Sequence, residues 1–435
     1  MDTNAKTRIL ILGGGFAGVY TALGLQDAWD DDPAVEVTLV SRNNYFLMTP
    51  LLFEAGSGVL EPRHVVNPIR PLFDSVRFIE GEVDAIDVDK RIVNVTQPGG
   101  EKLALTYDQA VLAMGGITNT RLVAGSKYAL TFKTLADAIF LRNHIIQLFE
   151  RADVEMEAKK KAALLTFILV GGGLVNTELC GELTAFLQTL QKRYPRVNPG
   201  DWHVEIIEGE DAIAREFDED LREYITDVLE HRGVKIRLNT RVKSIEPGCI
   251  HLPDGTDIPS ETIVLGTGVV PSPVVAALPI EKDKHGRAIT DATMQCKGRK
   301  DLWALGDCAQ IPDPSGKPYP PLAQHALREA RVLARNISAG IRGDALEPFV
   351  YKSKGTLAAL GDFAGAGKLM KLEIRGFLAW WVWRTYYVMQ MRSWSRRIRI
   401  ILDWTVALFV KNDIVQLDYL FRAPKGDSAA ARESE

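Results

Sequence analysis

The feature that most constrains the fold lies near the start of the chain, where a short apolar run leads into a glycine-rich turn. Residues 8–18 read RILILGGGFAG, and Ile9–Leu12 has the character of a strand buried on both faces. A G-x-G-x-x-G spacing then opens a helical stretch, Val19–Leu25. In such a turn the first glycine allows the bend, the second admits a pyrophosphate and the third lets helix and strand pack closely. The sequence therefore predicts a dinucleotide site at Gly13, Gly15 and Gly18.

A second strand, Val35–Val40, completes the expected strand–helix–strand unit. An acid commonly follows this strand and binds the adenosine ribose, but here Ser41 occupies the place. A hydroxyl can bind the ribose, but without charge assistance. The sequence therefore favours neither the presence nor the absence of a ribose contact at Ser41.

The same strand–glycine–helix pattern occurs again in the middle of the chain. Phe167–Val170 leads into Gly171-Gly172-Gly173 and then a helix through Glu178 and Glu182. The partner strand His203–Ile207 ends at Glu208, an acid suited to a ribose diol. A later strand, Glu261–Leu265, leads into Gly266-Thr267-Gly268. Two copies of the pattern make a two-nucleotide protein the favoured interpretation.

The chain then returns to the first domain through a strand at Leu302–Leu305 and the turn Gly306-Asp307-Cys308-Ala309. Asp307 is well placed to bind the ribityl hydroxyls of a flavin, although a plain turn residue is the simpler alternative. The following helix, Leu322–Ala339, can direct its N-terminus at the flavin ring.

The predicted fold class is α/β, with two Rossmann-like dinucleotide-binding domains, the second inserted in the first, and carboxyl-terminal amphipathic helices. Smaller features are strands at Phe78–Val83 and Arg91–Val95 in a small sheet, a strand at Tyr107–Ala113, a helix at Lys133–Glu150 and a charged connector at 151–161. The predicted boundaries are 1–150 and 296–350 for the two parts of the first dinucleotide-binding domain, 160–295 for the inserted second one, 351–423 for a membrane-association domain and 424–435 for a disordered tail.

The carboxyl-terminal block differs in character from the rest. Between Lys368 and Lys411 there are nine Lys or Arg residues against two acids, and five of the eight tryptophans lie there. Apolar bulk with interfacial aromatics and cations is typical of helices that lie in a membrane surface. A helix pair packed on the protein's own body or in a dimer is the alternative, and a homodimer is compatible with both. No stretch of 18 uncharged apolar residues predicts a simple membrane-spanning helix.

The composition argues against a nucleic-acid partner and against a cysteine-based redox or metal site. A net charge of −4 gives no reason to expect nucleic acid as a partner. The cysteines form no C-x-x-C pair, which favours reduced cytoplasmic thiols over a redox disulfide or a metal site; they are Cys180, Cys249, Cys296 and Cys308.

The chain resembles the type II, non-proton-pumping NADH:quinone oxidoreductases over almost its whole length. The resemblance rests on GGGFAG, NNYFLMTPLL, VGGG…ELCGEL, LGTGVVPSP, LGDCA, PPLAQHA and the terminal AWWVWRTYYVMQMRSWSRR…DW. It implies FAD in the first domain, NADH in the second and a carboxyl-terminal membrane anchor. Position by position, it implies FAD contacts at Gly13, Gly15, Gly18, Ser41, Asp307 and Ala323, NADH contacts at Gly171, Gly173, Glu208 and Gly268, and catalytic roles for Glu178 near the nicotinamide and Gln324 near the quinone.

Three positions depart from the family pattern. Asn176 replaces the third glycine of the second motif, which predicts weak or shifted NADH binding, and Leu174 and Val175 are bulkier than usual. Arg328 stands where a second glutamine is common, one helical turn after Gln324, so it changes the charge of the quinone pocket.

The predicted enzyme is an FAD-dependent NADH:quinone oxidoreductase, peripheral on the cytoplasmic face of the inner membrane. It would pass hydride from NADH to the flavin and two electrons to a membrane quinone. Glu208 favours NADH, because its carboxylate would repel a 2′-phosphate. The alternatives are an NAD(P)H reductase with a protein or thiol acceptor, and a redox-sensing flavoprotein with a degenerate NADH site. No metal is predicted.

Overall fold

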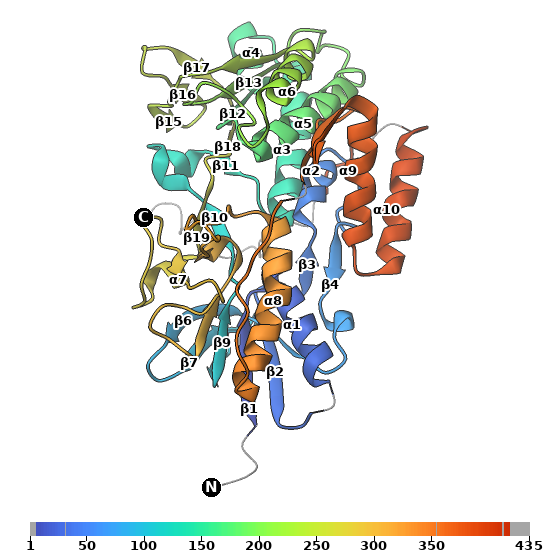
Figure 1. The fold of residues 1–435 in the computed structure, drawn as a ribbon. Coiled ribbons are helices and arrows are strands. Elements are labelled where there is room, and N and C mark those ends of the chain that lie inside the picture. Colours follow the sequence, from blue (N-terminus) through green and yellow to red (C-terminus); the bar gives the residue numbers. More distant parts are fainter. Residues whose placement is uncertain (1–5, 31, 354, 411–412, 418–435) are drawn as a thin grey trace. The chain divides into compact units, whose positions relative to one another are not determined.

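The computed structural model describes residues 6–30, 32–353, 355–410 and 413–417 (Figure 1). The chain forms two compact units, each assembled from three stretches of sequence. Unit 1 comprises 1–47, 66–117 and 269–352, and unit 2 comprises 48–65, 118–268 and 353–435. The predicted tail at 424–435 lies outside the described residues.

Unit 1 is built on a parallel five-stranded sheet of order β21-β9-β1-β2-β5. The central strand β1 (Thr7–Leu12) carries the apolar run, and Ile9–Leu12 is no more than 3% exposed, as a strand covered on both faces requires. Helices α1 (Phe16–Trp29) and α8 (Ala323–Arg342) pack against each other, with Trp29 Nε1 donating to Ser338 Oγ at 2.8 Å. Gly343, with a φ of +80°, ends α8.

One predicted strand of unit 1 is wrong. Residues Phe78–Val83 do not form one strand of a small sheet, because the chain changes sheet at Gly81. Before it, β5 (Arg77–Glu80) extends the main sheet beside β2 (Val35–Ser41), and after it β6 (Glu82–Asp87) pairs with β7 (Ile92–Thr96). A Cβ at Gly81 would lie 2.5 Å from Val95 Cγ1, so the crossing point has room only for glycine.

The remaining elements of unit 1 are short. They are β3 (Tyr45–Leu47), β4 (Val66–Pro68), η2 (Arg70–Leu72), β8 (Lys102–Thr106), β9 (Gln109–Leu112), β10 (Gly116–Thr118, whose last residue begins unit 2), β19 (Val269–Pro271), α7 (Pro273–Ala277), β20 (Ala288–Ile289), β21 (Leu302–Ala304), η5 (Gly306–Cys308) and β22 (Ala309–Gln310).

Unit 2 repeats the architecture with a parallel sheet of order β11-β18-β12-β13-β14. Strand β12 (Thr166–Val170) is central and leads into α5 (Leu174–Gln191), while β13 (His203–Ile207) has the predicted bounds. The α/β class with two parallel sheets is therefore confirmed. The other members of the sheet are β11 (Leu130–Thr131), β14 (Val234–Arg237) and β18 (Thr262–Leu265).

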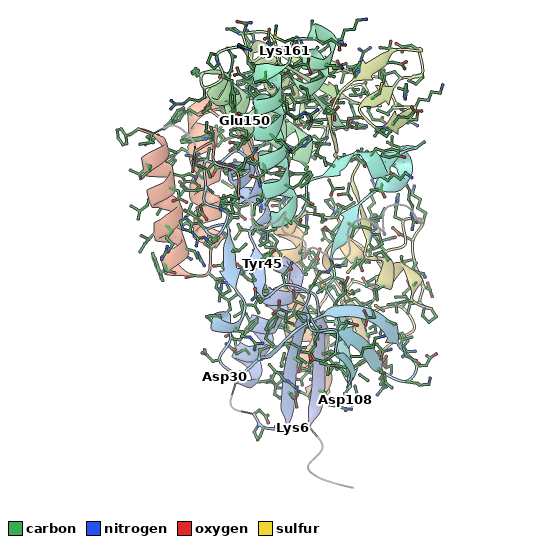
Figure 2. The ribbon with its side chains drawn as sticks, turned by 180° about the vertical axis from the view of Figure 1, so that it is seen from behind. Lys6, Asp30, Tyr45, Asp108, Glu150 and Lys161 are labelled. Atoms are coloured by element: carbon green, nitrogen blue, oxygen red, sulfur yellow. The ribbon has the colours of Figure 1, made fainter. Side chains whose placement is uncertain are left out.

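The connector predicted at 151–161 is largely helical. Helix α3 (Leu135–Val154), which begins with a capping box between Thr134 and Asp137, runs further than predicted, and α4 (Ala158–Leu164) follows. Alanine and lysine are good helix formers, which explains why this segment is helical. The prediction of a connector relied on its run of charges instead. Lys161 pairs with Asp201 at 2.8 Å, and Glu150 accepts a 2.9 Å hydrogen bond from Tyr194. Figure 2 labels Lys161 on α4 and Glu150 on α3.

Unit 2 also contains a short segment from the first part of the chain and the segment that follows residue 352. The excursion 48–65 carries η1 (Thr49–Leu51) and α2 (Leu52–Gly56), and the chain after Ser353 forms an antiparallel sheet and two helices. These are β23 (Gly355–Ala359), β24 (Gly365–Leu369), β25 (Leu372–Arg375), α9 (Gly376–Gln390) and α10 (Trp394–Ala407); the other elements of unit 2 are η3 (Thr120–Leu122), η4 (Ser126–Tyr128), α6 (Glu219–His231), β15 (Ser244–Glu246), β16 (Cys249–His251) and β17 (Asp257–Pro259).

The division into units differs from the predicted boundaries. Residues 118–150 belong to unit 2, because β11 pairs with β18 and α3 packs on α2 and α5. Residues 353–410 belong to the same unit rather than standing apart, because α9 packs on β23 and β24, and β23 in turn on α5.

Candidate functional site

The first glycine turn has the geometry that each glycine predicts. A Cβ at Gly13, whose φ is +118°, would lie 2.2 Å from the carbonyl oxygen of Ala113, and a Cβ at Gly18 would lie 1.8 Å from that of Gly13. Gly15 is different, since a Cβ there would meet nothing within 4 Å. The turn is therefore closed on the strand side and open on the side where a ligand phosphate would meet the N-terminus of α1.

Ser41 lies beside this turn at the end of β2. A Cβ at Gly14 would lie 2.4 Å from Ser41 Oγ, so the serine hydroxyl directly faces the glycine backbone. The structure thus places Ser41 at the position expected for a ribose contact.

The return strand of unit 1 brings Asp307 into a one-turn helix, η5, directly after β21. Gly306, with a φ of +68°, donates its N–H to the buried Glu329 Oε2 at 2.8 Å. Burial raises the pKa of Glu329 to about 7, although the Gly306 N–H opposes this shift. Glu329 therefore fixes the turn that carries Asp307, and the sequence reasoning missed it.

Ala323 and Gln324 form the first turn of α8, as predicted. The side chain of Arg328 turns back, and its Nη1 donates to the carbonyl oxygen of Gln324 at 2.7 Å. Its guanidinium also lies 4.4 Å from the ring centre of Tyr351. The charged group of Arg328 therefore interacts with a carbonyl oxygen and an aromatic ring of the protein itself.

The second glycine turn lies between β12 and α5 in unit 2. Gly171, with a φ of +99°, approaches Gly266 so closely that a Cβ would lie 2.5 Å from its carbonyl oxygen. At Gly173 the nearest atom to an added Cβ is Glu216 Oε1, at 3.7 Å, so this glycine is open in the same way as Gly15. Gly268, the other predicted glycine, has a φ of +80° and accepts a hydrogen bond from Asn119 N.

Asn176 does not push helix and strand apart as its side chain predicted. It is 1% exposed, and its Nδ2 donates to the carbonyl oxygens of Val170 at 3.0 Å and Gly171 at 2.9 Å. The room comes from Gly266, where a Cβ would lie 2.3 Å from Asn176 Nδ2. The glycine that makes room is therefore at the neighbouring strand end rather than on the helix, and within the described structure the buried Asn176 Oδ1 has no hydrogen-bond partner.

Glu208 lies at the end of β13, where the acid was predicted. Its Oε2 accepts the Gly172 N–H, and its Oε1 accepts the Glu210 N–H at 2.9 Å. The carboxylate is therefore fixed beside the second glycine turn. A further acid, Glu216, has Oε1 3.4 Å from the N–H of Leu174, at the start of α5.

Glu178 is buried on α5 in a set of polar contacts. Its Oε1 accepts the Ala359 N–H at 3.0 Å and the Trp383 Nε1–H at 3.1 Å. Burial raises the pKa of Glu178 to about 8, despite both donors. Burial and then the Glu54 carboxylate likewise raise the pKa of Glu182, which accepts a hydrogen bond from Ser57 Oγ at 2.9 Å.

A buried ion pair nearby in unit 2 has no local sequence signal. Glu54 of α2 is fully buried and binds Arg384 of α9, with Nη2 and Oε1 2.7 Å apart. Trp404 of α10 donates to the other carboxylate oxygen of Glu54 at 2.6 Å. The Arg384 guanidinium also lies 3.9 Å from the ring centre of Trp380. Glu54 thus joins three helices through one carboxylate.

Helices α9 and α10 expose many large apolar side chains, here called the apolar face. No helix within the described part of the chain has the length and apolar character to cross a membrane. Each residue of the face is at least half exposed: Phe377, Leu378, Trp381, Met389, Trp394, Ile398, Ile401, Leu402 and Val406.

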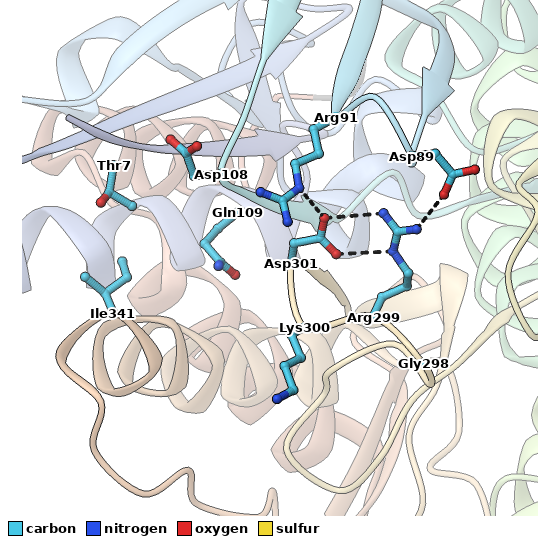
Figure 3. Close-up of a pocket in the computed structure, with 10 residues that line it drawn as sticks. All are labelled: Thr7, Asp89, Arg91, Asp108, Gln109, Gly298, Arg299, Lys300, Asp301 and Ile341. Atoms are coloured by element: carbon cyan, nitrogen blue, oxygen red, sulfur yellow. Dashed lines mark hydrogen bonds and ion pairs between the residues drawn. The ribbon is translucent and has the colours of Figure 1, made fainter. Parts of the chain in front are cut away.

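A pocket of about 640 Å³ opens in unit 1 beside Thr7 and Asp301, at the amino-terminal ends of the parallel strands (Figure 3). It is lined by an ion network in which Asp301 binds Arg91 at 2.8 Å and Arg299 at 3.2 Å. Ligands of such sheets bind at the carboxyl ends of the strands, which is the opposite edge. We assign this network a structural role. Among the described residues, no cluster of three or more His, Cys, Asp or Glu is arranged to hold a metal ion, and the four cysteines are free thiols.

Comparison with known proteins places this geometry in a family. A family model described as pyridine nucleotide-disulphide oxidoreductase matches residues 7–330, so the chain belongs to that class. It is 31% identical over 456 residues to the mitochondrial internal alternative NAD(P)H-ubiquinone oxidoreductase A1 of Arabidopsis thaliana, which covers 95% of this chain and 86% of that protein. It is 29% identical over 378 residues to a type II NADH:quinone oxidoreductase of Staphylococcus aureus, covering 85% of this chain and 92% of that protein. Within the class, the chain is a type II NADH:quinone oxidoreductase, which confirms the resemblance and its assignment as an enzyme.

Solved structures agree on the fold. A structure described as NDH2 from Plasmodium falciparum in complex with NADH superimposes with a TM-score of 0.88, covering 94% of this chain and all of that chain. Its sequence identity is 19%, so this match bears on the fold alone.

Proposed function

We propose that this chain oxidises NADH and reduces a membrane quinone through bound FAD, without pumping protons. The observation that carries the proposal is the pair of glycine turns. Each closes tightly on its own strand, and each leaves its second glycine open, Gly15 in unit 1 and Gly173 in unit 2. A single-nucleotide enzyme has no need of the second turn.

The residues of unit 1 fit FAD. The open backbone at Gly15 would receive the pyrophosphate, and Ser41 would meet the adenosine ribose. Asp307, on the turn that Glu329 fixes, would bind the ribityl hydroxyls, and Ala323 and Gln324 would direct the N-terminus of α8 at the ring and the quinone head. When bound, FAD supplies the two-electron chemistry that links NADH oxidation to quinone reduction.

In unit 2, Gly171, Gly173 and Gly268 would hold NADH, with Glu208 on the adenosine ribose. The fixed carboxylate of Glu208 favours a free 2′-hydroxyl and thus NADH over NADPH. The overall reaction converts NADH, one proton and quinone into NAD⁺ and quinol. Glu178, which its burial keeps protonated at neutral pH, would be the acid of unit 2 that holds a proton for this chemistry.

The apolar face of α9 and α10 would lie in the membrane surface. Nine cations accompany it between residues 368 and 411, and a quinone tail is insoluble in water, so the enzyme must meet its acceptor at lipid. The proposed location is peripheral, on the cytoplasmic face of the inner membrane, and a homodimer is compatible with it.

Anaerobic rapid mixing tests the proposal directly. NADH is expected to bleach the flavin absorbance of the purified protein, and a short-chain quinone is expected to restore it. Flavin released by denaturation should chromatograph as FAD. A protein that binds no flavin after reconstitution, or whose flavin neither NADH nor NADPH reduces, contradicts the proposal.

A further inference from the structure

Arg328 of α8 is held against the first turn of its own helix. Its Nη1 donates to the Gln324 carbonyl oxygen at 2.7 Å, and its guanidinium lies 4.4 Å from the ring centre of Tyr351. Tyr351 is supported in turn, because its backbone N–H donates to Tyr319 Oη at 3.0 Å and its ring meets the His325 ring at 80°, with centres 5.4 Å apart. The positive charge of Arg328 is therefore fixed beside the start of α8.

Within the described chain, no carboxylate pairs with Arg328. The first turn of the described helix α8 has neither an acidic residue nor a capping side chain, and the neighbouring Glu329 directs its carboxylate at the Gly306 N–H, 2.8 Å away. His325 is 4% exposed, and its Nδ1 has no hydrogen-bond partner in the described structure. Burial and then Arg328 lower the pKa of His325 to about 4, so this side chain adds no second charge at neutral pH. One fixed cation thus lies beside the positive end of the helix dipole.

This arrangement favours an anion placed before the start of α8. A cation near a helix N-terminus is unfavourable for the protein alone, whereas an anion there meets both the cation and the dipole. Hydride carries two electrons and one proton, so a flavin ring that accepts it from NADH gains one negative charge. Reduction of a quinone to quinol then uses both electrons, that proton and one further proton from solvent, and the flavin ring becomes neutral again.

We propose that Arg328 raises the two-electron reduction potential of the bound FAD by stabilising the negative charge of the reduced ring. This inference rests on the proposed function, since it presumes FAD with its ring before the start of α8. The charge acts over a distance through the poorly polarisable protein, so Arg328 need not touch the quinone. Arg328 would move driving force from quinone reduction to the reduction of the flavin by NADH.

The test measures the midpoint potential of FAD in the purified full-length protein, by anaerobic spectrophotometric titration against a reference dye. Arg328→Gln is expected to lower the two-electron equilibrium constant about tenfold, which corresponds to about 30 mV. Arg328→Lys keeps a positive charge and should recover at least half of that shift. Arg331→Gln removes an exposed cation further along the same helix, and as the matched control it should change the constant less than about twofold.

A second variant keeps the arginine but removes the ring beneath it. Tyr351→Leu frees the guanidinium to move towards solvent, so the potential should fall by less than in Arg328→Gln, with no further fall when the two changes are combined. If Arg328→Gln fails to retain FAD, an unchanged potential in Tyr351→Leu refutes the inference.

The outcomes separate this inference from the proposed function. If the parent protein binds no FAD after reconstitution, the proposed function fails. If FAD binds and NADH reduces it, but Arg328→Gln leaves the potential unchanged or lowers it no more than Arg331→Gln does, the role of Arg328 is refuted while the NADH:quinone activity stands.

Discussion

At the scale of single residues, Glu178 links burial to pH. Its pKa is raised to about 8 in the folded protein by burial, whereas an unfolded glutamate ionises near 4.5. Between these values the unfolded chain loses a proton that the folded chain keeps, so this group's contribution to the free energy of unfolding falls as pH rises. Below about pH 4.5 the contribution is fully present, and above about pH 8 it is lost.

Glu178→Gln keeps an acceptor for Trp383 and Ala359 but does not ionise, so it should abolish this loss. The difference in unfolding free energy between variant and parent is therefore expected to be about 2–3 kcal/mol larger, in favour of the variant, at about pH 8 than at about pH 5.5. Urea unfolding at both pH values measures the gain, with the exposed Glu230→Gln as control. Equal pH slopes for variant and parent would contradict a protonated Glu178.

Asn176 and Gly266 make a second residue-scale prediction. Gly266→Ala places a Cβ against the buried Asn176 side chain and should cost about 1–3 kcal/mol of unfolding free energy. In an Asn176→Gly background the same change should cost less, which a double-mutant cycle detects. Asn176→Gly alone loses two hydrogen bonds and should not tighten NADH binding. A large gain in NADH affinity would instead revive the interpretation of a degenerate site.

At the scale of elements, local sequence signals predict well wherever the neighbours of a residue lie close in the chain. The alternation and apolar content of His203–Ile207 give β13 its bounds, and the glycine spacing gives the turn after β1. Gly81 is harder, because the reason for glycine is the side chain of Val95 on another strand. The accommodation of Asn176 is equally invisible, since it depends on a glycine 90 residues later in the chain.

We expect the buried ion pair between Glu54 and Arg384 to hold α9 to α2. Arg384→Met leaves the Glu54 carboxylate buried without its cation and should destabilise unit 2 by about 3–5 kcal/mol. Adding Glu54→Gln removes the buried charge and should recover part of that loss. Arg77→Met, at an exposed pair with Glu36, should change stability by less than about 1 kcal/mol. Thermal and urea unfolding compare the four proteins. A double variant no more stable than Arg384→Met would show that packing, rather than charge, holds the helix.

At the scale of the whole molecule, the sequence predicts two nucleotide domains but not the course of the chain between the units. Residues 48–65 leave unit 1 between two paired strands, β3 and β4, to join unit 2. Their contact with α9 spans 330 positions, from Glu54 to Arg384, and no periodicity reports a partner so distant. The strand and glycine patterns come from local chemistry, whereas the division into units comes from tertiary packing.

The carboxyl-terminal helices give the last prediction. The buried side of α9, with Trp380, Trp383 and Arg384, already has its partners within unit 2, so the apolar face needs a different environment. Replacing Ile398, Ile401 and Leu402 with serine removes three exposed side chains of α10, each worth about 1.5–3 kcal/mol when fully buried in an apolar phase. Partition to lipid vesicles in a flotation assay should therefore fall more than tenfold, whereas the melting temperature should change little because these side chains are at least half exposed. If the triple variant still floats with the vesicles but changes from dimer to monomer in light scattering, the apolar face serves a second copy of the chain rather than the membrane.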